Sequence, residues 1–482
     1  MSDSHAGAYR PAGIPALTGE GLRFPSLPLS RPGAEAAAVA LLTPLFLYAA
    51  AWNHFPFLFF DSGAYVLEGF AKFFVPERSP VYSLFLGLVR GRADLWYVTW
   101  AQSVMTAFAV VEFSRALWPR TSLWKLLGAC LALSILTSIA WFVGQIEPDC
   151  MTAVLVLAMF PLAFRLKQLG WARALLLVPI AGFATAAHPS HLGLGAGLVL
   201  TLLAVRIVAM VRRPLRLPRP NVVLPVLAFS LGLGLVLVAN HSLTKPHAWF
   251  VSRSGAIFLT ARLMGDGVVG RTLDDICPAE HLKLCAYKDE LPETADEYLW
   301  APYSPFNKLG RFYGDYDEYR TIVAESLERY PLRSLAWGLW GSFRQYFMFR
   351  TGDGVEPQEW VLGPLFRGFM PKQYKHYLDA RQQRGLLSWP AVNVVHFPVA
   401  LFAQVWLAVV MWRAAARRRW NVAALPAFVL VALIGNALVC GLFSGPHDRY
   451  QSRLAWVPVL IVLLTARQTV ERALRRPVES GT

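Results

Sequence analysis

The sequence predicts an all-α polytopic membrane protein, with about ten transmembrane helices and a periplasmic α-rich insertion. Hydrophobic residues make up 55% of the chain and charged residues 16%, with a mean hydropathy of +0.40. This composition leaves too little polar surface for a water-soluble globule of 482 residues. Apolar runs of about 20 residues, the length that crosses a bilayer, recur along the chain.

These runs divide the chain into segments. Residues 1–33 are rich in Pro, Gly, Ser and Ala, so we expect a disordered cytoplasmic tail there. An N-terminal transmembrane module (34–240) and C-terminal transmembrane helices (390–467) flank the insertion (241–389), and a second cytoplasmic tail occupies 468–482. The predicted spans are 34–52, 95–115, 124–144, 150–168, 171–187, 190–211, 222–240, 390–412, 422–443 and 453–467.

Basic residues determine the predicted orientation. They gather in alternate loops between spans and after the last span, so these loops and both termini are expected in the cytoplasm. The positions are Arg115, Arg120, Lys125, Arg165, Lys167, Arg173, Arg212, Arg213, Arg216, Arg219, Arg413, Arg417, Arg418, Arg419, Arg467, Arg472, Arg475 and Arg476. The net charge of +15 therefore indicates topology in a bacterial inner membrane and predicts no nucleic-acid partner.

The opposite face carries a first loop at 53–94 and the insertion, which is too polar to span a bilayer. Two amphipathic segments of the insertion, 318–330 and 332–349, are expected to lie on the membrane surface. Arg344 in the middle of the second segment argues against an eleventh span.

Cysteine spacing gives one further expectation for the insertion. Cys277 and Cys285 are close enough in sequence to form a disulfide in an oxidising periplasm, with two free thiols as the alternative. Cys130, Cys150 and Cys440 lie in or beside spans and are expected to be packing residues.

Three carboxylates are candidate catalytic residues. Asp61 follows the first span in FLFFDSGAY, where aromatic neighbours make an unpaired charge costly, with a helix cap as the alternative. Glu147 and Asp149 lie in the next outside loop, where they equally suit the dipole of the helix that follows. The three could share a divalent metal, Mg²⁺ or Mn²⁺, although so few carboxylates are a weak metal signature.

Candidate phosphate-binding residues lie near the end of the chain, in HDRYQSR. Arg449 and Arg453 share a helix face if the last span begins near Asp448, with interfacial anchoring beside Tyr450 as the alternative. In another outside loop, His188 and His191 are expected to stabilise a turn rather than ligate a metal.

Several segments follow one another in an order found in a membrane enzyme superfamily. They are DSGAY after the first span, then ERSPVYSLFLGLV, IEPDCMTAVLVLAMFPLAFRLK, GFATAAHPSHLGLGAGLVL and HDRYQSRLAW. Together they resemble the GT-C superfamily of polyprenyl-phosphate-sugar glycosyltransferases. The likeness covers roughly the first 210 residues and the last 40, and it leaves the insertion unmatched.

This resemblance implies transfer of a sugar from a polyprenyl-phosphate donor to a glycan, lipid or protein acceptor at the membrane. Asp61 would be the general base, with Glu147 or Asp149 orienting the acceptor or a metal. Residues implied to contact the donor phosphate are Arg78, Arg449, Arg453 and Tyr450, and residues implied to support the acceptor are Tyr65, His188 and His447. The Asp-Ser pair and His188 depart from the superfamily's frequent Asp-Glu and Lys, which bears on metal dependence and donor contact.

Two other classes remain open. A periplasmic polysaccharide polymerase or ligase with lipid-diphosphate donors would depend on residues of the insertion instead of Asp61, namely Arg253, Arg262, His281 and Arg311. A non-enzymatic lipid-glycan transporter is less favoured because the spans show neither central charges nor repeated halves. Nucleotide-sugar donors are not expected, since no Gly-rich phosphate loop is present.

Overall fold

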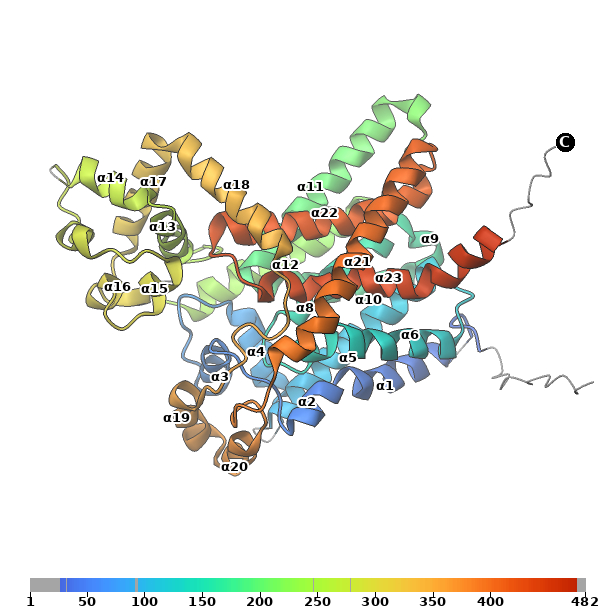
Figure 1. Ribbon diagram of the computed structural model, residues 1–482, viewed down its shortest axis with the longest axis horizontal. Helices are drawn as coiled ribbons and strands as arrows, with labels where there is room; N and C mark the ends of the chain where they lie inside the picture. Colours follow the sequence, from blue (N-terminus) through green and yellow to red (C-terminus); the bar gives the residue numbers. More distant parts are fainter. Residues whose placement is uncertain (1–26, 32, 92–93, 246, 278, 475–482) are drawn as a thin grey trace, which may run out of the picture.

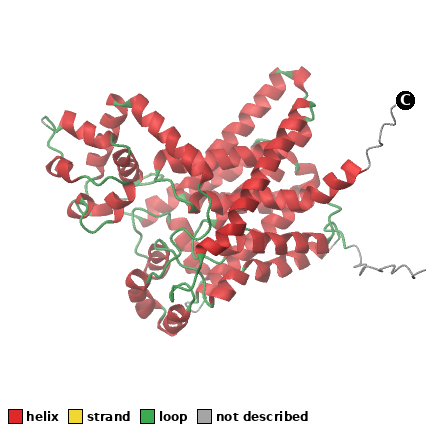
Figure 2. Cartoon of the chain, viewed as in Figure 1, coloured by secondary structure: helices red, strands yellow, loops and turns green. Residues whose placement is uncertain are grey.

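The computed structural model describes residues 27–474 apart from 32, 92–93, 246 and 278, with backbone alone for 466–474. About 75% of the protein is helical and the described residues contain no β-strand (Figure 2). The all-α prediction is therefore confirmed.

The helices follow one another along the whole described chain (Figure 1). They are α1 (Ala34–Phe46), α2 (Tyr48–Asn53), α3 (Ser62–Ala71), α4 (Pro80–Val89), α5 (Leu95–Leu117), α6 (Leu123–Leu136), α7 (Ile139–Val143), α8 (Cys150–Phe164), α9 (Leu166–Leu169), α10 (Trp171–Ala186), α11 (Pro189–Val211), η1 (Arg213–Leu215), α12 (Val223–Leu243), α13 (Gly255–Gly265), α14 (Val268–Ile276), η2 (Lys283–Glu290), α15 (Ala295–Trp300), α16 (Pro305–Lys308), η3 (Arg311–Tyr313), α17 (Tyr316–Arg329), α18 (Pro331–Phe347), α19 (Glu359–Phe369), α20 (Pro371–Asp379), α21 (Trp389–Ala416), α22 (Trp420–Phe443) and α23 (Arg449–Leu474).

Helices occupy every segment that the sequence predicts to span the membrane. Five stretches are long and apolar enough to cross a bilayer: α1 and α2 taken together, α11, α12, α21 and α22. These identify a membrane protein, while the total of ten spans stays a prediction. The predicted span 124–144 is divided into α6 and α7, because the backbone of Thr137 is extended (φ −142°, ψ 175°).

The main core surrounds α8. Its sequence CMTAVLVLAMFPLAF is apolar on all sides, and the residues from Cys150 to Ala163 are buried. A helix without a polar face is stable only when neighbours enclose it. Here α5, α10, α11, α12, α22 and α23 pack around it, so N-terminal and C-terminal helices form one bundle.

The C-terminal end of the predicted disordered tail packs on the bundle. Residues 1–26 lie outside the described part, but the backbone N–H of Leu29 donates to the Thr121 carbonyl oxygen at 2.9 Å. The Leu29 side chain is fully buried. This apolar side chain finds a place in the core, so the expectation of disorder does not hold for this short segment.

The first half of the insertion has its own core. Apolar residues of α13, α14, α15 and α17 pack together there, and the disulfide between Cys277 and Cys285 joins the end of α14 to η2. The expected surface helix at 318–330 is α17, whose Tyr319 and Ile322 instead point into this core. Neighbouring helices thus bury the apolar side chains of α17 that were expected to face the bilayer, and a position of this helix on the membrane surface stays a prediction.

The helix α18 leads from this core back to the bundle. Small residues on one side, Ser334, Gly338, Gly341 and Ser342, are buried, and Gly338 and Gly341 lie against the end of α22. Its large apolar side chains, Leu335, Leu339, Trp340, Phe343 and Phe347, remain exposed on the other side. Arg344 is exposed as well.

The second half of the insertion packs on the 53–94 segment. In Figure 1, α19 and α20 lie beside α3, at the end of the bundle away from the C-terminus. Gln382 accepts a hydrogen bond from Leu58 N–H at 3.0 Å, and its own backbone N–H donates to Asn53 Oδ1 at 2.8 Å. The insertion therefore holds the segment that leads into Asp61.

We predict that the cysteines fall into two chemical groups. Maleimide added to the denatured, unreduced protein should label the three free thiols, Cys130, Cys150 and Cys440, and a reductant should expose Cys277 and Cys285. Mass spectrometry of the labelled peptides measures this pattern. Labelling of Cys277 without reductant would contradict the disulfide.

Candidate functional site

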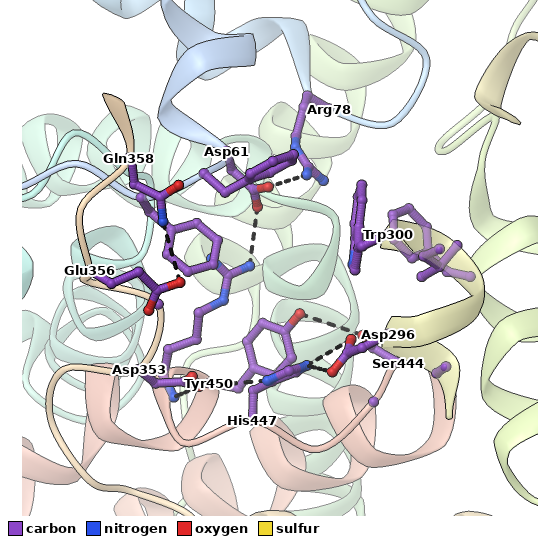
Figure 3. A pocket seen from close by; sticks show the side chains of 18 of the residues that line it. Asp61, Arg78, Asp296, Trp300, Asp353, Glu356, Gln358, Ser444, His447 and Tyr450 are labelled. Atoms are coloured by element: carbon purple, nitrogen blue, oxygen red, sulfur yellow. Dashed lines mark hydrogen bonds and ion pairs between the residues drawn. The ribbon is translucent and has the colours of Figure 1, made fainter. Parts of the chain in front are cut away.

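A cavity of about 620 Å³ lies where the insertion meets the bundle (Figure 3). Its walls come from the 53–94 segment, from α15 and α16, from the loop before α19 and from the connection between α22 and α23. The polar side chains that line it are Asp61, Arg78, Asp296, Asn307, Arg311, Asp353, Glu356, Gln358, Ser444, His447, Arg449 and Tyr450. Predicted site residues from both ends of the chain thus meet here.

Asp61 lies in the wall of the cavity between two arginines. Its side chain makes no cap bond to α3, which excludes the capping alternative. Instead, Oδ1 is paired with Arg78 Nη2, and Oδ2 lies 3.2 Å from Arg449 Nη2 (Figure 3). Two guanidinium groups offset the cost of burying this carboxylate, which is only 5% exposed.

Backbone hydrogen bonds between the segment before α3 and the segment after α7 position Asp61. Phe57 N–H donates to the Gly144 carbonyl oxygen at 2.9 Å, and Ile146 N–H donates to the Phe57 carbonyl oxygen at 2.9 Å. Next to Asp61, Ser62 Oγ lies 3.3 Å from Glu147 Oε1. Glu147 is buried outside the cavity lining, and burial raises its pKa well above the usual value, with Asp61 raising it further. Its contacts indicate a positioning role.

Arg449 is fixed by the loop before α19. Its backbone N–H, at the start of α23, donates to Asp353 Oδ2 at 3.1 Å, and its guanidinium lies 4.0 Å from the centre of the Phe59 ring. Gly354 has φ +73° and lies so close to Phe59 that a Cβ would overlap the ring. Arg449 Nη1 is buried without a hydrogen-bond partner among the described residues.

His447 lies between α22 and α23 and contacts two carboxylates of the insertion. Its Nε2 lies 3.3 Å from Asp296, and its Nδ1 lies 3.7 Å from Asp353. Burial favours the neutral ring, but hydrogen bonds to Asp296 and Asp353 outweigh it and raise the pKa of His447 to about 10. A cation therefore lies between two carboxylates on this side of the cavity (Figure 3).

Asp149 and Arg453 meet outside the cavity lining. Arg453 Nη1 lies 2.6 Å from Asp149 Oδ1, and Nη2 donates to Ser190 Oγ at 2.9 Å and Asn436 Oδ1 at 3.0 Å. Arg453 is fully buried. These contacts join α8, α11, α22 and α23, so the pair holds the bundle together.

Two other predicted residues also lie outside the cavity lining. Tyr65 is buried one helical turn after Asp61, with its ring 4.9 Å from that of Tyr82. His188 caps α11, because its Nδ1 accepts from Ser190 N–H at 3.2 Å. The expected turn-stabilising role of His188 is confirmed.

The carboxylates do not fit a divalent metal. Both oxygens of Asp61 are paired with arginines, and Asp149 is paired with Arg453, so a metal ion would meet guanidinium charges. Within the described residues, no group of three or more His, Cys, Asp or Glu is arranged to hold a metal. An anion suits the surplus of arginine near Asp61 better.

The insertion supplies cavity residues that the sequence analysis missed. The rings of Trp300 and Trp360 lie 5.5 and 6.0 Å from the ring of Phe60, on the cavity wall. The polar members are Asp296, Asn307, Asp353, Glu356 and Gln358. The segments DEYLW and GDGVEPQEW place acidic residues beside tryptophan, which was an available signal for a binding surface.

The residues that would serve a polymerase or ligase are dispersed. Arg262 is buried and pairs with Asp266, Arg253 donates to the Lys245 carbonyl oxygen, and His281 is exposed. Of the four, Arg311 lines the cavity. This arrangement does not favour the polymerase alternative.

Comparisons of the chain with protein families, curated proteins and solved structures found no match. The class of protein is therefore defined by the fold and the cavity alone. It is a helical membrane protein whose polar, aromatic-lined cavity lies at the insertion end of the bundle.

We predict that the His447 contacts stabilise the protein in a pH-dependent way. A pKa raised from the ordinary value of about 6.5 means that this stabilisation is complete at low pH and is lost as the pH rises through about 10. The measurement is the difference in unfolding temperature between wild type and His447→Gln from pH 6 to about 10.5. A difference that does not shrink over this range would exclude the charged bridge.

Proposed function

We propose that the protein is an integral membrane glycosyltransferase, which moves a sugar from a polyprenyl-phosphate donor to a hydroxyl of a glycan, lipid or protein. The observation that carries the proposal is the pairing of Asp61 with Arg78 and Arg449 in the wall of the cavity. It combines a potential base with phosphate-binding groups.

The arginines support binding of a phosphate. Two guanidinium groups face the single carboxylate of Asp61, so the arginines outnumber the carboxylate in these ion pairs. Arg449 Nη1 and Arg78 Nε are buried donors with no partner in the described chain. A phosphate oxygen would satisfy them, and such charge-assisted bonds are stronger than neutral ones.

The rest of the cavity supports binding of a sugar. Trp300, Trp360 and Phe60 present apolar ring faces, while Glu356 and Gln358 offer oxygen and amide groups to hydroxyls. The volume of about 620 Å³ lies within the usual range for small-molecule sites. Because apolar helices adjoin it, a prenyl chain can remain in the bilayer while its phosphate reaches the arginines.

The reaction proceeds in one transfer step. Arg78 and Arg449 turn toward the donor phosphate, which weakens their hold on Asp61 and makes its carboxylate a stronger base. Asp61 accepts the proton of the acceptor hydroxyl while that oxygen forms a bond to the anomeric carbon. The bond between this carbon and the phosphate oxygen breaks, and the arginines stabilise the departing polyprenyl phosphate.

We expect Asp61→Asn to lower the transfer rate about 10²- to 10⁴-fold, because the amide cannot accept the proton. The assay follows labelled sugar from a polyprenyl-phosphate donor in membranes that contain equal amounts of each variant. Asp317→Asn, which changes an exposed carboxylate on α17, is the matched control. Full activity in the Asp61→Asn variant would refute the base role and favour the polymerase or transporter classes.

Arg449→Ala should raise the KM for the donor about tenfold or more, because a charge-assisted hydrogen bond to the phosphate is lost. Initial rates over a donor concentration series give KM and kcat separately. Arg329→Ala, on the exposed face of α17, controls for the loss of a positive charge. An unchanged KM would remove Arg449 from the donor site.

A further inference from the structure

A second pocket lies at the connection between α21 and α22. It has a volume of about 210 Å³ and is lined by Trp406, Val409, Val410, Arg413, Ala414, Arg417, Arg419 and Val422. We call it the arginine pocket. It contains three arginines and no acidic residue. In Figure 1 this connection lies at the end of the bundle opposite α13 to α17, far from the cavity.

The guanidinium groups of these three arginines are available to a ligand. Throughout the described residues, the side chains of Arg413, Arg417 and Arg419 make no hydrogen bond and no ion pair. Some arginines near the ends of other helices are paired, such as Arg115 with Glu112 and Arg173 with Glu35. Three unpaired guanidinium groups around one hollow create a local potential that favours an anion.

The surroundings identify the kind of anion. Both α21 and α22 are long and apolar enough to cross a membrane, and the arginines lie at their joined ends. Phe402, Val405, Val409 and Trp412 are exposed at helical spacing on α21 and form an apolar stripe that leads toward these arginines. A ligand with a phosphate group and an apolar chain matches both features, whereas a soluble anion matches the charge alone.

We propose that the arginine pocket binds the phosphate head group of an anionic phospholipid, with an acyl chain along the apolar stripe of α21. Basic pockets between transmembrane helices suit such head groups. The pocket is separate from the cavity around Asp61, so this inference does not depend on the proposed activity.

If the three arginines served only to orient the helices in the membrane, lipid binding would not depend on the pocket. Arg212, Arg213 and Arg216, at the end of α11 and in η1, carry the same charge but lie outside this pocket. Replacement of either set removes three positive charges from a short loop between spans. Lipid binding that depends on the pocket requires the first set and not the second.

The test compares retained lipids by native mass spectrometry of the full chain, purified in detergent and titrated with phosphatidylglycerol or phosphatidylcholine. Wild type should retain phosphatidylglycerol in preference to phosphatidylcholine. The R413Q/R417Q/R419Q variant should bind phosphatidylglycerol at least about tenfold more weakly, since each arginine near a head group contributes about fivefold. The R212Q/R213Q/R216Q variant should bind as wild type does.

Several outcomes would overturn the proposal. Equal loss in both triple variants would mean nonspecific attraction to basic loops, and equal retention of the two lipids would exclude head-group recognition. Full competition by glycerol phosphate at equal concentration would show that a soluble anion suffices. If the triple variant does not fold, R417Q in the same assay should weaken binding about fivefold, and unchanged binding in R417Q would then refute the site.

Discussion

The carboxylate of Asp61 depends on two arginines that reach it from distant parts of the chain. Arg78 follows it in the 53–94 segment, whereas Arg449 begins the last helix, 388 residues away. Removal of one partner from a buried ion pair typically costs about 3–5 kcal/mol, because the remaining charge stays buried. The same contact that forms the cavity wall therefore also joins the N-terminal part of the chain to the last helix.

Two arginines of α23 have different structural roles. Arg449 lies in the cavity wall, whereas Arg453, one turn later, is fully buried against Asp149. The deeper pair fixes the position of α23 relative to α8, and the register of the helix then directs Arg449 toward Asp61. The contact of Arg453 with Asp149 thus keeps Arg449 in place at the cavity wall. In the proposed reaction, such preorganised charge would stabilise the departing phosphate.

Sequence reasoning predicted the helical fold from apolar runs, and it assigned Asp61 and Arg449 to the same face of the bundle from the charges of the loops. Arg78 was assigned to the same site only by the family resemblance. The sequence could not show which of Arg449 and Arg453 lines the cavity, since the two lie four residues apart on one predicted helix face. Burial decides between them, and burial is a property of the assembled bundle. The insertion residues Asp353 and Glu356 were missed for a related reason. They lie in an irregular loop without periodicity, and only the folding of the whole insertion brings them to the cavity.

The helix α18 joins the two halves of the insertion, and each half contributes a wall of the cavity: α15 on one side and the loop before α19 on the other. Its small residues let it approach α22 closely, with Gly441 against Gly341 and Ser342. A Cβ added at Gly441 would overlap the backbone of Ser342, so these glycines set how far α18 lies from α22. The spacing of both cavity walls from the bundle consequently depends on the absence of side chains at one helix crossing.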